Sequence, residues 1–142
     1  MAAGIDFTNT LGELKGASNR VLFNGAGVAA GDVDGNGHPD LFFCGLDTPN
    51  QLYLNSGSWK FSPSRIPDSM ALPGFPTRGA VLADLNGDQS LDLVMTTVGG
   101  GLRSFINDGK GRFLENTVEA GLEGHSGGST IALADIDGNG SI

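Results

Sequence analysis

The acidic residues of this chain gather in three short stretches that share one internal spacing. Eight of its sixteen acids lie there, and the other eight match the eight basic residues, so the stretches account for the formal net charge of −8. Oxygen-bearing side chains stand at positions 1, 3, 5 and 9, and position 7 offers a backbone carbonyl. Hard oxygen ligands at this density suit Ca²⁺. The candidate ligands are Asp32, Asp34, Asn36, the carbonyl of His38 and Asp40 in the first stretch; Asp84, Asn86, Asp88, the carbonyl of Ser90 and Asp92 in the second; and Asp135, Asp137 and Asn139 in the third.

The three stretches are not equivalent. The second has Gln89 where the others have Gly, so we expect its site to be strained or weaker. The third ends before position 9, and we expect it to be incomplete as a site. Asx-Gly hairpin turns, which need no metal, are the alternative for each stretch. Three stretches in register favour metal binding instead.

An EF-hand is excluded on two grounds. That motif requires a bidentate Glu at position 12 of the loop and a helix on each side. Position 12 is Phe43 or Met95 in this chain, and the flanking segments have strand character.

The chain repeats with a period of about 52 residues. DVDGNGHPD at 32–40 aligns with DLNGDQSLD at 84–92 at an offset of 52, without a gap, and the alignment continues through Asn55 and Asn107. The third stretch begins at Asp135, an offset of 51. We therefore count the end of one repeat, two full repeats and the start of another.

Each repeat contains four short segments with strand character. Apolar runs of about four residues, bounded by Gly and Asx, are typical of buried strands. Long helical periodicity is absent from the sequence. Four short strands in one repeat of this length fit one blade of a β-propeller. The expected strands are 28–30, 41–44, 51–54 and one opened by Phe61 in the first repeat; 80–83, 93–95, 102–106 and one opened by Phe113 in the second; and 131–134 in the third.

We therefore predict an all-β fold, a partial β-propeller of about two and a half blades with four antiparallel strands each. Residues 1–26 would hold the outer strand of a preceding blade and a connection. Residues 27–78 and 79–128 would form one blade each, and 129–142 the first strand and the start of the calcium loop of a further blade.

The composition excludes several classes of protein. The excess of acids argues against nucleic-acid binding, which depends on Lys and Arg. No apolar run reaches the length of a membrane span, and the first residues lack the pattern of a secretory signal. The single cysteine, Cys44, leaves no internal disulfide, and we expect a small buried hydrophobe rather than a reactive thiol.

The two ends of the blades should differ in role. In an up-and-down blade, the acidic stretches and the turns that follow Asn55 and Asn107 lie at one end, and the remaining connections lie at the other. Because function concentrates on loops, the end without acidic stretches is our candidate recognition surface for a protein or glycan.

Four residues are candidates for ligand binding. Arg65, Phe75 and Arg78 belong to a long Pro-rich connection at the recognition end. The alternative, which we favour slightly, is that Met70 and Phe75 fill the gap between blades. Trp59 could stack on a sugar, although covering a blade edge is the more common role of such a side chain.

The sequence offers little for catalysis. His125 lies near Ser126 and Ser129 but has no Asp partner in the local sequence, and neither a nucleophile elbow nor a zinc-binding helix is present. We therefore predict that this chain is not an enzyme.

The segments GVAAGDVDGNGHPDLFF (27–43) and NQLYLNSGSWKF (50–61) resemble the FG-GAP/VCBS repeat of integrin-alpha-type calcium-binding β-propellers. Similar bacterial repeats often accompany an ASPIC/UnbV region. The resemblance covers about residues 5 to 142 and implies a Ca²⁺ ion between the first and second strands of a blade, held by the candidate ligands above. It also implies an extracellular or periplasmic location. Members of this family are mostly adhesion, lectin-like or scaffold domains, and a minority are enzymes such as polysaccharide lyases.

The chain is shorter than a closed ring of such blades. A fragment of a larger protein, closure by association of several copies, and an open array would each account for this, and we favour the fragment. End blades would expose apolar surface, so we expect self-association through the open blade faces. Two functions follow: a calcium-stabilised module that recognises protein or glycan, which we favour, or part of a secreted propeller enzyme acting on polysaccharide.

Overall fold

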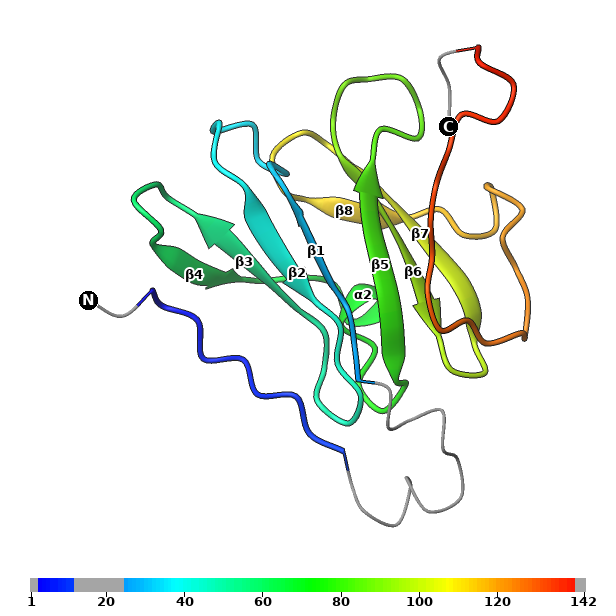
Figure 1. Ribbon diagram of the computed structural model, residues 1–142, viewed down its shortest axis with the longest axis horizontal. Helices are drawn as coiled ribbons and strands as arrows, with labels where there is room; N and C mark the ends of the chain where they lie inside the picture. Colours follow the sequence, from blue (N-terminus) through cyan, green and yellow to red (C-terminus); the bar gives the residue numbers. More distant parts are fainter. Residues whose placement is uncertain (1–2, 12–24, 140–142) are drawn as a thin grey trace.

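The computed structural model describes residues 3–11 and 25–139, which contain two four-stranded antiparallel sheets (Figure 1). In each sheet the strands lie side by side in the order of the chain. The prediction of an all-β fold built from propeller-like blades is confirmed. Blade 1 consists of β1 (Val28–Gly31), β2 (Asp40–Phe43), β3 (Gln51–Asn55) and β4 (Phe61–Ser64), and blade 2 of β5 (Thr77–Ala83), β6 (Asp92–Thr97), β7 (Gly101–Asn107) and β8 (Phe113–Glu115).

The register of the first two strands positions the acidic stretches. In blade 1 the β1–β2 ladder ends at the pair Gly31 and Asp40, so the intervening residues form a loop. In blade 2 the β5–β6 ladder ends in the same way at Ala83 and Asp92. Each ninth-position aspartate is therefore the first residue of a strand, held by the sheet and not by the loop alone.

The core lies between the two blades. Phe42 from blade 1 and Leu93 and Phe105 from blade 2 have no exposed surface, and they belong to one continuous apolar cluster. Burying a side chain of this size contributes about 1.5–3 kcal/mol. The apolar runs of the sequence are thus explained by packing of blade against blade.

A one-turn helix, α2 (Asp68–Ala71), lies in the connection between the blades, where the sequence predicted no helix. Its Met70 is fully buried in the shared core. Asn50 holds the turn, because its Nδ2 donates to the carbonyl of Met70 at 2.8 Å and its backbone N donates to that of Ala71 at 2.8 Å. Met70 therefore fills the gap between the blades, whereas Phe75 is 56% exposed.

The N-terminal segment contains no assigned strand within its described residues, 3–11, although 1–26 was expected to hold one. It packs on blade 1 through single contacts instead. Phe7 stacks on Phe43 with ring centroids 5.0 Å apart, and the hydroxyl of Tyr53 donates to Asp6 at 2.5 Å. The other part of that prediction, residues 12–24 and the first two residues, lies outside the described residues.

The C-terminal segment also differs from the expected strand at 131–134, because no strand is assigned between 129 and 139. The segment runs alongside β5 (Figure 1). A Cβ built on Gly79 of β5 would lie 3.3 Å from the backbone of Thr130 and of Ile131. In blades 1 and 2 the first strand pairs with the strand after the acidic loop, and the described residues contain no such partner for this segment.

Cys44 is 1% exposed and packs in the shared core, as predicted. Burial raises the pKa of its thiol from the ordinary value of 9.0 to about 12. Within the described ranges, no helix has the length and apolar character required to span a bilayer.

Candidate metal centre

Loop 1, residues 32–40, curls around the carboxylate of Asp32. One oxygen of Asp32 accepts hydrogen bonds from the backbone N of Gly35 at 2.8 Å and of Asn36 at 3.1 Å, and the other accepts from Gly37 N at 2.7 Å. Gly37 has a φ of +82°, a conformation that glycine adopts without steric cost. The first aspartate thus shapes the loop that carries the others.

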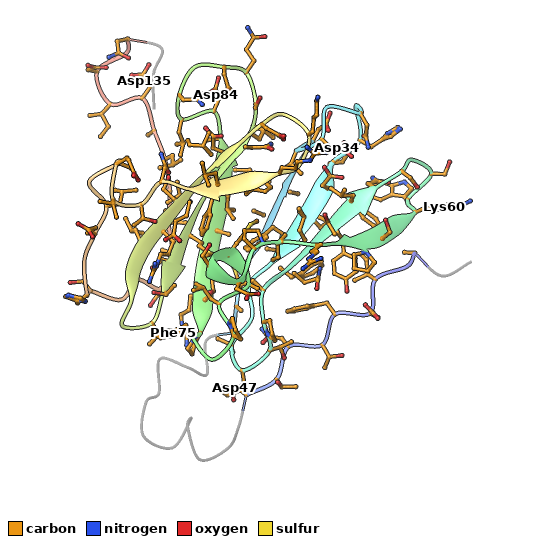
Figure 2. The ribbon with its side chains drawn as sticks, turned by 180° about the vertical axis from the view of Figure 1, so that it is seen from behind. Asp34, Asp47, Lys60, Phe75, Asp84 and Asp135 are labelled. Atoms are coloured by element: carbon orange, nitrogen blue, oxygen red, sulfur yellow. The ribbon has the colours of Figure 1, made fainter. Side chains whose placement is uncertain are left out.

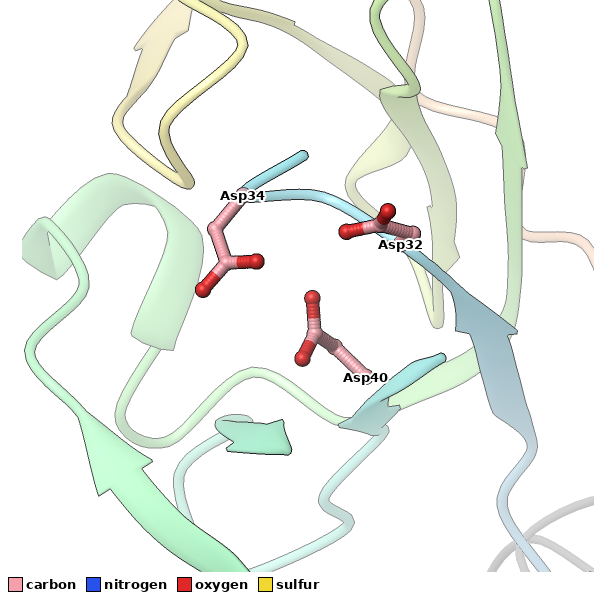
Figure 3. Close-up of side chains that lie close together, drawn as sticks. All are labelled: Asp32, Asp34 and Asp40. Carbon is pink, nitrogen blue, oxygen red and sulfur yellow. The ribbon is translucent and has the colours of Figure 1, made fainter. Parts of the chain in front are cut away.

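The three carboxylates of loop 1 converge. One oxygen each from Asp32, Asp34 and Asp40 lies within 4.8 Å of the others, and Figure 3 shows the three groups facing a common point. Oxygens that bind one Ca²⁺ at about 2.3–2.6 Å are at most about 5 Å apart. The spacing and the chemistry of these oxygens therefore fit a calcium ion.

Asp40 is the buried member of this group, with no exposed surface. Burial raises the pKa of its carboxyl, and the negative charges of Asp34 and Asp32 add to that rise. Hydrogen bonds from the backbone N of Asn55 and of Val33 oppose it. A cation at the centre of the group would remove the repulsion between the three charges.

Asp32 differs from Asp40 in its electrostatics. Its slight burial would raise the pKa, but hydrogen bonds from the backbone N of Gly37, Asn36 and Gly35 together hold the pKa below its ordinary value. Asp32 is therefore ionised and ready to bind a cation at neutral pH.

The predicted ligands Asn36 and His38 lie on the exposed rim of loop 1. The side-chain oxygen of Asn36 accepts from His38 N at 2.8 Å, and its Nδ2 donates to the carbonyl of Asn55 at 2.9 Å. Asn36 thus ties the loop to the end of β3. Coordination through its Oδ1 and through the carbonyl of His38 stays a prediction.

Loop 2, residues 84–92, repeats this curl with different side chains. Asp84 accepts from the backbone N of Gly87 at 2.7 Å and from that of Gln89 at 2.8 Å. Gln89 has a φ of +69°, in the region that favours glycine, as the sequence indicated. In the third position Asn86 donates its Nδ2 to Asp88 at 2.9 Å. Loop 2 therefore has its amide at position 3 and its carboxylate at position 5, the reverse of Asp34 and Asn36 in loop 1.

In loop 2, as in loop 1, the buried ninth-position carboxyl has a raised pKa and a more exposed carboxyl has a lowered pKa. Burial raises the pKa of Asp92, the charges of Asp88 and Asp84 add to the rise, and backbone hydrogen bonds from Asn107 and Leu85 oppose it. Hydrogen bonds from the backbone N of Ser90 and from the side chain of Asn86 lower the pKa of the exposed Asp88. Ser90 N lies 2.7 Å from Asp88 Oδ1, so this predicted ligand closes the loop around its neighbour.

The third acidic stretch begins the same curl in a fully exposed segment. Asp135 accepts from Gly138 N at 2.7 Å and from Asn139 N at 3.1 Å, and Asp137 accepts from Asn139 Nδ2 at 3.0 Å. The backbone of the third stretch therefore turns around Asp135 as loops 1 and 2 turn around Asp32 and Asp84.

The acidic loops lie together at one end of the molecule, as predicted. Figure 2 shows Asp34, Asp84 and Asp135 at that end, with Lys60 of the β3–β4 turn beside them, and Asp47 and Phe75 at the opposite end. The acidic loops therefore share one end of the molecule, and the exposed ring of Phe75 lies at the other.

The four predicted ligand-binding residues do not form one site. Arg78 is only 4% exposed and its Nη1 donates to the carbonyl of Gly25 at 3.2 Å, so its inclusion in an exposed surface was wrong. The error arose because β5 begins at Thr77 and takes Arg78 into the sheet. Trp59 is 74% exposed but belongs to the β3–β4 turn, at the acidic end. Arg65 is exposed after β4, so Arg65 and Phe75 remain as candidates at the recognition end.

Two segments of the chain, residues 32–95 and 84–142, match the FG-GAP-like repeat. The chain belongs to the FG-GAP-like repeat family. The two matches overlap at loop 2, and each begins at the first aspartate of an acidic loop, so the acidic loop is part of the FG-GAP-like repeat itself. No curated protein matches the chain.

One contact between these FG-GAP-like repeats was not predicted from the sequence. Asn107 of blade 2 donates its Nδ2 to the carbonyl of Val33 in loop 1 at 2.8 Å, and Gly111 N donates to the same carbonyl at 2.9 Å. Asn107 was recognised from the repeat as part of a turn. A bond from one blade to the acidic loop of the other leaves no signal in the spacing of a single repeat.

Proposed function

We propose that this chain is a calcium-binding β-propeller module in which Ca²⁺ stabilises the loops between the first and second strands of each blade. The observation that carries the proposal is the convergence of Asp32, Asp34 and Asp40 in the loop of an FG-GAP-like repeat. Loop 2 would bind a second ion through Asp84, Asp88 and Asp92.

Each of the three carboxylates of loop 1 would have a different role. Asp32 shapes the loop, and Asp34 and Asp40 would supply further carboxylate oxygens, Asp40 from the end of a strand. When bound, the ion supplies positive charge that offsets the repulsion of three close carboxylates. Calcium in this role is structural, because it joins the loop to the sheet.

We further propose that the module acts by binding rather than by catalysis, in an extracellular or periplasmic setting. The end of the molecule opposite to the acidic loops would recognise a protein or glycan. In support, Phe75 is exposed there and lines a groove of about 570 Å³ together with Arg103, Glu115, Val118 and His125. An aromatic ring beside charged and polar groups suits either kind of ligand.

Self-association through the open face of blade 2 is also part of the proposal. A groove of about 510 Å³ between this blade and the C-terminal segment is lined mainly by apolar side chains, among them Leu102, Ile106 and Ile131. Apolar surface of this kind often marks a protein interface. Light scattering coupled to size exclusion would show a dimer or larger species that the change Leu102→Glu converts to monomer.

Calcium titration of the purified protein by calorimetry tests the main proposal. We expect binding in the range of about 10⁻⁴–10⁻³ M, which is typical of extracellular modules, with magnesium bound more weakly. The double change Asp34→Asn and Asp88→Asn should abolish the heat of binding. Absence of a calcium signal in the wild-type protein would refute the proposal.

Recognition requires a separate experiment. Glycan and protein arrays would be probed with the wild-type chain and with Phe75→Ser, each in calcium and in EDTA. A ligand captured by the wild-type protein in calcium and lost with Phe75→Ser would support the assignment of the recognition end. A ligand captured equally by both proteins would place recognition elsewhere.

A further inference from the structure

Asn107 lies between the two acidic loops. It is the last residue of β7 and is 1% exposed. Its backbone N donates to Asp92 of loop 2 at 2.8 Å, and its side-chain Nδ2 donates to the carbonyl of Val33 in loop 1 at 2.8 Å. One buried residue of blade 2 therefore bonds to both loops.

Val33 continues this path into the candidate metal centre. Its backbone N donates to Oδ2 of Asp40 at 2.9 Å, and its side chain is 1% exposed in the core between the blades. Three hydrogen bonds, through Val33 and Asn107, thus join Asp40 of loop 1 to Asp92 of loop 2. Both aspartates are fully buried ninth-position residues of their loops.

The contacts of the Asn107 amide indicate why an asparagine stands there. Its Nδ2 donates both to Val33 and, at 3.1 Å, to the carbonyl of Leu91, whereas its buried Oδ1 accepts no hydrogen bond from the described residues. A buried acceptor without a partner costs free energy. The position therefore requires the two donors of the amide rather than its acceptor.

The equivalent residue of blade 1, Asn55, bonds within its own blade in the part of the chain that the structure describes. Asn55 donates its Nδ2 to the carbonyl of Pro39 at 3.0 Å, as Asn107 does to Leu91, and its Oδ1 accepts from Gly57 N at 3.0 Å. The bond from Asn107 to Val33 reaches the acidic loop of the preceding blade, and the described residues hold no such loop before blade 1.

We propose that Asn107 is a positioning residue that couples cation binding in loop 1 to cation binding in loop 2. The coupling rests on the proposed calcium function. A cation bound by Asp40 would restrain Val33, whose carbonyl accepts the hydrogen bond from Asn107. Because the backbone of Asn107 holds Asp92, ordering of either loop reduces the entropy that must be lost when the other is ordered. Such coupling is reciprocal, so each ion strengthens the binding of the other.

Calcium titration followed by two-dimensional amide NMR tests the coupling, since the amides of Gly37 and Gln89 report on loops 1 and 2 separately. Asn107→Asp keeps the shape of the side chain and removes both donors. We expect it to raise the dissociation constant of loop 1 about fivefold or more, although loop 1 belongs to the other blade. Asn55→Asp is the matched control, because it removes the equivalent amide donor to the carbonyl of Pro39 in blade 1. The change in the dissociation constant of loop 1 in this variant measures the effect of losing such a bond within one blade. The same local effect is expected for loop 2 in Asn107→Asp.

A second variant leaves the core untouched. Asp88→Asn weakens loop 2 from an exposed position, and coupling predicts that the dissociation constant of loop 1 rises as well. A loop 1 constant that stays at its wild-type value in Asp88→Asn refutes the coupling, whether or not Asn107→Asp folds. A coupling that persists in Asn107→Asp refutes the role of Asn107. If calcium moves neither reporter amide in the wild-type protein, the calcium function itself fails and the coupling with it.

Discussion

The carboxylate of Asp40 accepts a hydrogen bond of 2.7 Å from the backbone N of Asn55, so the last residue of loop 1 is bonded to the strand beside it. The second oxygen of Asp40 accepts from Val33 N. Asp92 has the same two kinds of partner in blade 2, Asn107 and Leu85. The ninth-position aspartates therefore support the fold even without a metal ion.

The hydrogen bonds of Asp40 predict that removing its carboxylate destabilises the metal-free protein more than changing that of Asp34. Asp40→Ala leaves two backbone N–H groups without partners and should reduce the free energy of unfolding by about 2–5 kcal/mol in EDTA. Asp34→Asn keeps the acceptor for Asn36 and should change it by less than about 0.5 kcal/mol. Urea unfolding in EDTA measures both values.

Calcium should change the stabilities of these two variants by different amounts. Asp34→Asn should lose most of the calcium-dependent stabilisation that the wild-type protein gains in loop 1, although its stability in EDTA is unchanged. Equal losses for Asp40→Ala and Asp34→Asn in EDTA would contradict the separate roles assigned to them.

Gln89 offers a stabilising substitution. Its φ of +69° is unfavourable for a side chain with a Cβ, so Gln89→Gly should raise the free energy of unfolding by about 0.5–1 kcal/mol, after the extra entropy of glycine in the unfolded chain is included. Gln89→Ala retains the strain and serves as the matched control. Urea unfolding would refute this account if Gly and Ala at this position gave equal stability.

Met70 and Phe75 belong to one connection but should respond in opposite ways to truncation. Met70→Ala opens a cavity between the blades and should cost about 2–5 kcal/mol, because Met70 has no exposed surface. Phe75→Ala removes a ring that is 56% exposed and should cost less than about 0.5 kcal/mol. Thermal and urea unfolding of the two variants compare them directly, and a large loss for Phe75→Ala would contradict the assignment of its ring to the surface.

Cys44 should react only when the protein unfolds. Its thiol is 1% exposed and burial raises its pKa to about 12, so iodoacetamide should label the native protein slowly at mildly alkaline pH and the urea-unfolded protein fast. The folded pKa exceeds the ordinary value of 9.0, so the contribution of this thiol to stability is complete below pH 9 and is lost as the pH rises toward about 12. Rapid labelling of the native protein would contradict its burial, and Cys44→Ala should flatten the fall of stability at alkaline pH.

The sequence predicted those features that repeat. Four apolar runs per period predicted four strands, and the alternate oxygens of Asp32, Asp34 and Asp40 predicted a shared centre, because both patterns follow from local geometry. The burial of Arg78 was not predicted, since β5 begins at Thr77, three residues before the apolar run 80–83 that marks it.

Contacts between the blades could not be predicted from the sequence either. The bond from Asn107 to Val33 depends on how one sheet packs on the next, and a repeat pattern describes only one sheet at a time. The segment 131–134 has the apolar composition of a strand, but a strand also needs a partner for its backbone groups, and composition does not supply one.

A thermal melt in millimolar calcium and in EDTA tests the central claim, that metal in the acidic loops supports the blades. With free calcium about tenfold to one hundredfold above the dissociation constant, each occupied loop should add about 1.4–2.7 kcal/mol and raise the melting temperature by several degrees. Magnesium should give a smaller rise, and Asp34→Asn with Asp88→Asn should give none. Identical melting temperatures of the wild-type protein in calcium and in EDTA would contradict the account and leave loops 1 and 2 as turns that need no metal.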